Sequence, residues 1–318
     1  MKALHLVFMG TPLFAVPVLE LLRTSRHHLA AVVTQPDRPR ARGRRICFSP
    51  VKEWAVRHGV EVLQPARLLD DHFWERLRAI NPALIVTAAY GKLLPPKLLQ
   101  YPPLGCINLH ASLLPAYRGA APIHRAVMEG AARSGVTVME MAPEMDAGNI
   151  IMQMEEPIAL DDTAGTLHDR LAEAGARLLL QAVDALAAGT ATSRPQDPAA
   201  ISYAPPLRPE EEIIDWHRGA VSLHNQVRGM NPWPGAYTIC GGKRLKVRRT
   251  ALPEQLPEKA FPPAPPGTIF CTGGKTLYAA TGDGPLALLE VQPDGKRPMS
   301  GGEFYCGRRF EPGCRLGT

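Results

Sequence analysis

Apolar runs alternate with amphipathic stretches along the first half of the chain. The runs are apolar at nearly every position, which is typical of strands that are buried on both faces of a sheet. Strands that alternate with helices indicate a parallel sheet covered by helices, so we predict a Rossmann-like α/β domain with a mostly parallel sheet and helices on both faces. The predicted strands are 3–9, 29–34, 60–63, 84–88 and 105–109, with extended segments at 136–141 and 150–154, and the predicted helices are 16–22, 49–57, 70–79 and 166–186.

Two helix starts carry the same signal, a hydroxyl residue followed by proline. Thr11-Pro12 and Ser49-Pro50 each offer a side-chain oxygen that can accept a hydrogen bond from a free backbone N–H group. Proline suits the first helical position because it has no N–H group to leave unpaired. We therefore expect Thr11 and Ser49 to be N-caps.

The composition changes after residue 188. Five prolines fall between residues 189 and 209, which predicts an extended linker. Beyond it, a predicted helix is followed by short strands with Gly and Pro between them, a pattern typical of a small barrel. We expect a first domain at 1–188, a linker at 189–208 and a small OB-like β-barrel domain at 209–318. The expected helix is 221–228, the expected strands are 237–240, 245–248, 268–270, 277–280 and 286–291, and a proline-rich loop covers 253–266.

Charge and cysteine content indicate a cytoplasmic protein. The 318-residue chain has a net charge of +6, which suits an anionic partner without requiring one. Its six cysteines form no C-x-x-C pair, so free thiols in a reducing compartment fit better than a zinc or disulfide framework. The apolar start stops at Gly10-Thr11-Pro12, which favours a first strand over a signal peptide. No run reaches the roughly 18 apolar residues of a membrane span.

A polar pair, Asn108 and His110, lies at the end of the strand predicted at 105–109. Residues at i and i+2 of a strand point to the same side, so an amide and an imidazole converge where ligands bind in open α/β sheets. The apolar loop Ser112–Pro115 that follows could form a pocket wall. Asp146 lies in a turn-like segment and could simply form that turn. On spacing alone, the pair could instead satisfy only loop backbone groups, and both interpretations stay open.

The turns after the first and fourth predicted strands contain no nucleotide motif. Neither Gly10-Thr11-Pro12 nor Ala88-Ala89-Tyr90-Gly91 matches G-x-G-x-x-G or a phosphate loop. The sequence therefore gives no support to nucleotide binding at this sheet.

A combination of motifs resembles the folate-dependent formyltransferases. It consists of Asn108-Leu109-His110-Ala111-Ser112-Leu113-Leu114-Pro115, Tyr117-Arg118-Gly119 and the later Asp146. The similarity extends to Phe8–Pro12, Gln35–Pro39, Arg42-Gly43, Ser49–Lys52, Asp215-Trp216 and Asn231–Ala236, so it covers essentially the whole chain. Family members that act on glycinamide ribonucleotide share the Asn-x-His core but typically lack such a C-terminal domain. The resemblance is therefore to members that formylate methionyl initiator tRNA.

The resemblance implies that the formyl group of 10-formyltetrahydrofolate passes to the α-amine of methionine on initiator tRNA. Attack of the neutral amine puts negative charge on the formyl oxygen, which Asn108 and His110 would stabilise by hydrogen bonding. Asp146 would orient His110 and help to move a proton from the amine. No metal is required, the first domain would be catalytic, and the last would bind tRNA. The pterin of the folate cosubstrate would dock near two loops, made of Ala88, Ala89, Tyr90 and Gly91 and of Ser112, Leu113, Leu114 and Pro115.

Basic side chains gather in two places. The first is a loop after the second predicted strand, which in the formyltransferase family is a tRNA-recognition loop. The second lies on the strand at 245–248, where alternate residues share one face. Either cluster could be only a solvated surface, but a basic face on an OB-like barrel suits sequence-independent nucleic-acid binding. The predicted tRNA contacts are Arg38, Arg40, Arg42, Arg44 and Arg45 in the loop, and Arg244, Lys246 and Arg248 on the barrel.

Three other functions stay open on the sequence. A formyltransferase for a small amine, such as glycinamide ribonucleotide or a nucleotide-sugar, is disfavoured by the basic C-terminal domain. A noncatalytic RNA-binding protein is disfavoured by the intact Asn108, His110 and Asp146. A hydrolase that releases formate could use the same oxyanion site with water. We expect a monomer that binds tRNA and folate and has no membrane partner.

Overall fold

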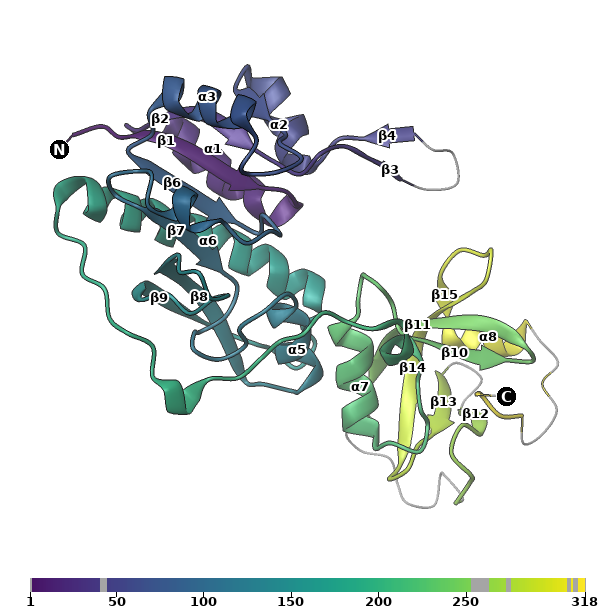
Figure 1. Cartoon of the computed structure of the whole chain (residues 1–318). Helices are drawn as coiled ribbons and strands as arrows, with labels where there is room; N and C mark the ends of the chain where they lie inside the picture. The colour runs from purple at the N-terminus through teal and green to yellow at the C-terminus, as the bar shows by residue number, and fades with distance from the viewer. Residues whose placement is uncertain are drawn as a thin grey trace. The chain divides into compact units, whose positions relative to one another are not determined.

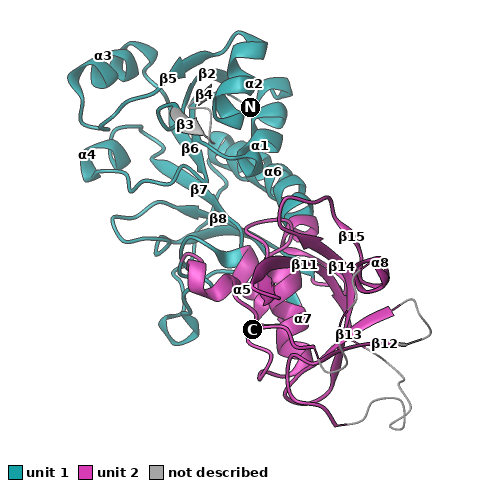
Figure 2. Cartoon of the chain, turned by 90° about the vertical axis from the view of Figure 1, so that its right-hand side faces the viewer, with its two compact units in different colours: residues 1–122, 133–157, 168–205 teal, residues 123–132, 158–167, 206–318 magenta. Residues whose placement is uncertain are grey.

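The computed structural model describes residues 2–40, 45–252, 263–272, 276–307, 310 and 314–317. The chain forms two compact units (Figures 1 and 2). Unit 1 comprises residues 1–122, 133–157 and 168–205, and unit 2 comprises residues 123–132, 158–167 and 206–318. The chain therefore passes between the units five times. The domain boundaries expected at 188/189 and 208/209 stay a prediction.

Unit 1 is built on a seven-stranded sheet with the strand order β5-β2-β1-β6-β7-β8-β9. The pairs from β5 through β7 are parallel, while β8 and β9 are antiparallel strands at one edge (Figure 1). The mostly parallel, Rossmann-like sheet is thus confirmed. The strands are β1 His5–Gly10, β2 His28–Val33, β5 Glu61–Leu63, β6 Leu84–Ala88, β7 Cys106–His110, β8 Arg133–Glu140 and β9 Ile150–Pro157.

Helices cover both faces of this sheet. On one face, Ile85 of β6 and Cys106 of β7 share a buried apolar cluster with Trp74 of α3. On the other, Gly175 of α6 lies so close to Leu109 that a Cβ at residue 175 would stand 2.8 Å from a Leu109 methyl group. Within the described residues, no helix combines the length and the apolar character needed to cross a membrane. The helices of unit 1 are α1 Val16–Thr24, α2 Pro50–His58, α3 Asp71–Ile80, α4 Pro96–Leu99 and most of α6 Ala164–Ala188, whereas α5 Pro122–Met128 lies almost entirely in unit 2.

The two predicted N-caps have different outcomes. Ser49 is confirmed, because its Oγ accepts a hydrogen bond of 3.1 Å from the Lys52 backbone N–H at the start of α2. Thr11 is not a cap, and that prediction is wrong. A 3-10 turn at Leu13–Ala15 precedes α1, and the Thr11 hydroxyl instead donates a hydrogen bond of 3.3 Å to the carbonyl of Tyr90. The hydroxyl of Thr11 therefore anchors the loop after β6 rather than a helix.

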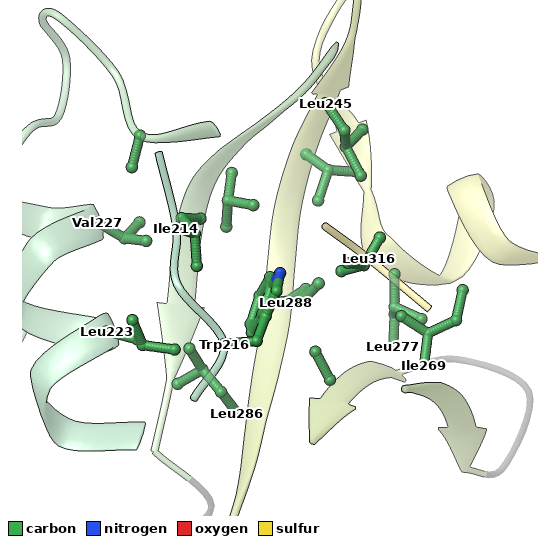
Figure 3. Close-up of a cluster of buried hydrophobic side chains, with 14 of the residues drawn as sticks. Ile214, Trp216, Leu223, Val227, Leu245, Ile269, Leu277, Leu286, Leu288 and Leu316 are labelled. Carbon is green, nitrogen blue, oxygen red and sulfur yellow. The ribbon is translucent and has the colours of Figure 1, made fainter. Parts of the chain in front are cut away.

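Unit 2 contains an antiparallel sheet with the order β10-β11-β14-β13-β12, and β15 pairs with β14. Apolar side chains on its inner face, including Leu245 and Leu288, pack around Trp216 and α7 (Figure 3). This curled sheet agrees with the predicted OB-like domain. The elements are η3 Pro209–Glu212, α7 Ala220–Gly229, β10 Tyr237–Cys240, β11 Lys243–Ala251, β12 Ile269–Thr272, β13 Thr276–Ala280, β14 Pro285–Pro293, β15 Met299–Ser300 and α8 Gly301–Cys306.

Residues 314–317 bond to both outer strands of this sheet. The Ile269 N–H of β12 donates to the Cys314 carbonyl at 3.0 Å, and the Gly317 N–H donates to the Ile239 carbonyl of β10 at 2.8 Å. The short segment therefore covers backbone groups that the sheet itself leaves unpaired at its two edges.

Segments 123–132 and 158–167 supply partners that the rest of unit 2 needs. Arg228 of α7 is buried, and its Nη1 donates to the carbonyls of Ala159 at 3.3 Å and Asp162 at 3.1 Å. Arg125 of α5 forms an ion pair with Glu211, and this hydrogen bond lowers the pKa of the Glu211 carboxyl. A buried guanidinium is costly unless hydrogen bonds compensate it, so these segments are structural parts of unit 2.

Candidate active site

Asn108 and His110 lie on β7 at its carboxyl end, on the sheet face opposite Leu109. Asn108 is paired in register with Thr87 of β6, whose Oγ1 lies 2.7 Å from Asn108 Oδ1 and 3.1 Å from the Ile107 carbonyl. A hydroxyl has one proton, and the shorter contact assigns that proton to Asn108 Oδ1. Asn108 Nδ2 is then left to donate, and within the described residues no group accepts from it. Thr87 is not among the site residues predicted from the sequence, although a lone polar residue in the apolar run Leu84–Ala88 is a usable signal.

The imidazole of His110 is buried between two partners. Its Nε2 lies 3.0 Å from the carbonyl of Tyr117, and because a carbonyl only accepts, Nε2 carries a proton. Its Nδ1 faces Asp146 Oδ1 at 3.6 Å, which is an ion-pair distance but too long for a hydrogen bond. The structure thus brings the three predicted catalytic side chains of unit 1 to one place.

Asp146 also forms the turn that the sequence suggested. Its backbone is left-handed, with φ of 53°, and its Oδ2 accepts a hydrogen bond of 2.9 Å from the Gly119 N–H. Two residues on, a Cβ on Gly148 would stand 1.7 Å from the Glu140 carbonyl of β8. The turn is therefore pressed against the end of β8, and this close approach fixes where the carboxylate points.

The loop 88–91 follows β6 and is anchored by its backbone. Ala89 and Gly91 have positive φ, and the Tyr90 carbonyl accepts from Gln35 Nε2 at 3.1 Å as well as from Thr11. The Tyr90 hydroxyl is buried and has no hydrogen-bond partner among the described residues, and burial raises its pKa to about 12. The carbonyl contacts hold the loop at the carboxyl end of the sheet.

The loop 112–115 packs tightly on the antiparallel edge. Thr137 Oγ1 donates to the Ser112 carbonyl at 2.7 Å and accepts from the Leu114 N–H at 3.1 Å. Gln153 Nε2 donates to the Leu114 carbonyl at 2.8 Å. These backbone groups are thus used within the protein, and Leu113 and Pro115, both partly exposed, are the loop's surface.

An open cavity of about 930 Å³ lies in unit 1, and the segment that directly follows loop 88–91 forms part of its wall. It is lined by residues 66–71 after β5, 92–96 after β6, and Pro143 between β8 and β9. Leu69 and Leu93 on its wall are 59% and 63% exposed, so apolar surface faces the opening. Arg67 and Lys92 are the cationic side chains of the lining. Exposed leucines beside cations are typical of a ligand site. This cavity was not predicted from the sequence.

Comparison with known proteins shows the family. Residues 1–183 match the family described as Formyl transferase, and residues 206–309 match Formyl transferase, C-terminal domain. The methionyl-tRNA formyltransferase of Moorella thermoacetica is 48% identical over 314 residues, covering 99% of this chain and 99% of that protein. The chain belongs to the methionyl-tRNA formyltransferase family. Methionyl-tRNA formyltransferase from Bacillus subtilis is 44% identical, covering 99% of this chain and 98% of that protein.

Solved structures confirm the fold of this formyltransferase. HypX from Aquifex aeolicus in complex with tetrahydrofolic acid aligns with a TM-score of 0.66 and 17% identity, covering 98% of this chain and 49% of that chain. WlaRD, a sugar 3N-formyl transferase, aligns with a TM-score of 0.65 and 17% identity, covering 93% and 100%. At this identity the likeness supports the architecture and assigns no substrate.

The arginine-rich segment of the formyltransferase is in part a hairpin, where the sequence predicted a loop. Strands β3 Arg38–Arg40 and β4 Arg45–Cys47 pair antiparallel, with Arg40 opposite Arg45. Arg42 and Arg44 lie outside the described residues. The loop prediction missed this pairing because Pro39 and the high charge disfavour strand, whereas Arg38–Arg40 still finds a partner strand a few residues away.

The base of this hairpin is held by a polar cluster. Asp37 pairs with Lys52 of α2, and Gln64 donates to Asp37 Oδ1 at 2.8 Å and accepts from Lys52 Nζ at 2.7 Å. The hydrogen bonds from Lys52 and Gln64 lower the pKa of the Asp37 carboxyl. On the other side of the hairpin, the Phe48 ring lies under Lys52 Nζ at 4.1 Å. Both ends of the hairpin are therefore fixed to α2.

The basic residues of β11 share one outer face, as the spacing predicted, because Leu245 and Val247 between them are buried. Two of the three already have carboxylate partners. Arg244 pairs with Glu212 at 3.2 Å and lies over the Tyr237 ring, and Arg248 pairs with Glu290 at 3.2 Å. Lys246 Nζ donates to the Pro234 carbonyl at 3.3 Å, and among the described residues no carboxylate lies within ion-pair distance of it.

Proposed function

We propose that this protein transfers the formyl group of 10-formyltetrahydrofolate to the α-amine of methionyl initiator tRNA. The observation that carries the proposal is the group of Asn108, His110 and Asp146 at the carboxyl end of β7. Relatives that are 44% and 48% identical over nearly the whole chain are methionyl-tRNA formyltransferases, which supports this acceptor. The same group in a protein without unit 2 would leave the acceptor open.

The reaction assigns a role to each side chain. The neutral amine attacks the formyl carbon, and the formyl oxygen gains negative charge as a tetrahedral species forms. Asn108 Nδ2, the donor left over by the Thr87 contact, bonds that oxygen. His110 adds a second hydrogen bond when its Nε2–H turns from the Tyr117 carbonyl to the formyl oxygen. The amine proton leaves toward Asp146, directly or through a water molecule. The C–N bond to the folate then breaks, and the folate nitrogen takes up a proton. The balanced products are the formylated amine and tetrahydrofolate.

The folate cosubstrate would occupy the cavity beside loop 88–91. A volume of about 930 Å³ is sufficient for a ligand of this size, and the exposed leucines on its wall suit an aromatic ring system. Arg67 and Lys92 line the same cavity, together with Asp70 and Asp71, and the two cations suit the glutamate carboxylates of folate. In this proposal loops 88–91 and 112–115 position the pterin near Asn108. No metal takes part.

The basic hairpin and the β11 face would hold the tRNA. The Asp37 cluster fixes the base of the hairpin to α2. In this proposal residues 1–188 catalyse, residues 209–318 bind tRNA, and Arg38, Arg40, Arg42, Arg44 and Arg45 contact the acceptor stem. We further propose that the enzyme works as a monomer in the cytoplasm.

The deciding assay offers two acceptors in competition. Purified protein is mixed with formyl-labelled tetrahydrofolate, charged initiator methionyl-tRNA and glycinamide ribonucleotide. We expect label on the tRNA-bound methionine and none on the ribonucleotide. Label on the ribonucleotide would assign a small-amine acceptor, and label released as formate with either acceptor present would assign a hydrolase.

Lys246→Ala should weaken tRNA binding more than Arg244→Ala does. Lys246 has no carboxylate partner among the described residues, whereas Arg244 is already paired with Glu212. Neutralising a phosphate with Lys246 therefore releases more counterions from the tRNA than neutralising one with Arg244. We expect the slope of log affinity against log salt to fall by about 1 for Lys246→Ala and by less for Arg244→Ala. Filter binding at several salt concentrations measures both slopes, and equal slopes would contradict the assignment.

A further inference from the structure

The segment 189–205 falls between the two family matches, which end at residue 183 and begin again at residue 206. Its prolines predict an extended linker, and it runs past β9 (Figure 1). It is nevertheless bonded to unit 1 along its length. Arg194 and Ile150 of β9 exchange two backbone hydrogen bonds of 2.8 and 2.9 Å. We call residues 194–204 the strap.

The second half of the strap is bonded to the loop that follows His110. The Arg118 N–H donates to the Ser202 carbonyl at 2.9 Å, and the Ala204 N–H donates back to the Arg118 carbonyl at 2.7 Å. Ser202 Oγ accepts from the Tyr117 N–H at 2.9 Å. A Cβ on Gly119 would stand 2.6 Å from the Ala204 carbonyl, so the loop and the strap are in close backbone contact.

Gln196 connects the strap to the Asp146 turn through both ends of its amide. Nε2 donates to the carbonyls of Asp146 and Gly148, each at 2.8 Å. Oε1 accepts from Arg118 Nε at 3.1 Å and Nη2 at 2.7 Å. Carbonyls only accept and a guanidinium only donates, so this amide has one possible orientation. Arg118 is 8% exposed, so Gln196 also solvates a buried cation.

The backbone groups that position His110 and Asp146 are therefore next to strap contacts. The Tyr117 carbonyl accepts from His110, and the Tyr117 N–H is held by Ser202. The Gly119 N–H orients the Asp146 carboxylate, and the Asp146 carbonyl is held by Gln196. The 3.6 Å gap between His110 Nδ1 and Asp146 Oδ1 is thus set by two loops that the strap ties together.

We propose that the strap is part of the active site and that Gln196 is a positioning residue for formyl transfer. It acts through the backbone of Asp146 and through Arg118, and touches neither substrate. The inference deepens the proposed function and rests on it. A misplacement of about 1 Å at a reacting group costs on the order of 10² in rate, so loss of Gln196 falls mainly on kcat.

The test is a double-mutant cycle on the full-length enzyme. Gln196→Ala, Asp146→Asn and the double variant are compared in single-turnover formyl transfer, with Thr192→Ala as the control because Thr192 is exposed on the same segment. We expect Gln196→Ala to lower kcat by about 10- to 100-fold with less than about threefold change in either KM. In the Asp146→Asn background the same substitution should have almost no further effect, because Gln196 acts through Asp146. Thr192→Ala should match the wild type.

The outcomes separate the two proposals. If Asp146→Asn itself leaves the rate unchanged, the catalytic assignment fails. If Asp146→Asn is slow but Gln196→Ala is not, or if their effects multiply independently, the strap proposal fails and the catalytic one stands. Ser202→Ala is the second variant, since it removes only the contact to Tyr117 and keeps Arg118 solvated. The Tm of each variant is measured first, and its rate of formyl transfer is then measured well below that Tm. A lower rate then cannot be due to unfolding.

Discussion

We expect Asp146→Asn and His110→Ala each to lower the single-turnover rate of formyl transfer by about 10²- to 10³-fold while tRNA still binds. Asparagine keeps the shape of the side chain and still accepts from the Gly119 N–H, but it removes the charge that faces His110 Nδ1 at 3.6 Å. The amine proton then has no base to receive it, and proton transfer of this kind contributes about 10²–10⁴ in rate.

Asp169→Asn is the matched control for this pair. Asp169 is exposed on α6, which packs on the opposite face of the sheet, and its Oδ1 lies 2.9 Å from His168 Nδ1, so the substitution removes the same kind of charge beside another histidine. Its rate should stay within about twofold of the wild type, as for a surface change away from the chemistry. Near-normal rates in Asp146→Asn and His110→Ala would refute the mechanism, and lost tRNA binding in either would show that the substitution disturbed more than the chemistry.

Asn108→Ala should lower kcat by about 10²- to 10³-fold, the typical cost of losing one oxyanion donor. The change removes Nδ2, while the Thr87 hydroxyl that held the amide can still donate to the Ile107 carbonyl at 3.1 Å. The strand is therefore left without a new unpaired group, and the loss falls on the transition state. The measurement is kcat with saturating folate and charged tRNA.

Thr87→Val provides the comparison for Asn108→Ala. It keeps the Asn108 amide but removes the contact that fixes which end of it faces outward. We expect a smaller fall in kcat, since the donor remains present but is oriented for only part of the time. If Thr87→Val is as slow as Asn108→Ala, the effect lies in the packing of β6 against β7 and the donor role of Nδ2 is lost.

The core of unit 1 was predictable because its signal is local. Runs such as Leu84–Ala88 are apolar at every position except Thr87, and this pattern is typical of a strand that is buried on both faces of a sheet. The same local logic placed Asn108 and His110 on one side of β7. It failed at Thr11, where the hydroxyl finds the Tyr90 carbonyl, 79 residues away, instead of the first turn of a helix. Long-range competition of this kind leaves no trace in the neighbouring sequence.

The supporting residues of the site could not be read from the sequence for the same reason. Asp146 lies in a turn, and nothing near it in the sequence indicates that His110 faces it, so its role came from the family resemblance. Gln196 sits among prolines that predict a free linker, yet its partners lie 48 to 78 residues away. Prolines remove backbone donors but do not prevent an extended segment from pairing through its other residues, such as Arg194 and Ser202.

Because the chain passes between the units five times, unit 2 cannot be exchanged between two such enzymes by a single crossover in the sequence. A recombination event at a single point near residue 206 would bring in a new sheet around Trp216, but it would leave behind segments 123–132 and 158–167. The incoming Arg228 would then have to find its carbonyl partners in a host sequence that never evolved beside it. Unit 2 is therefore inherited as three separate stretches of sequence. A working chimera therefore needs all three stretches from the same parent, although residues 206–318 look like a complete domain in the sequence.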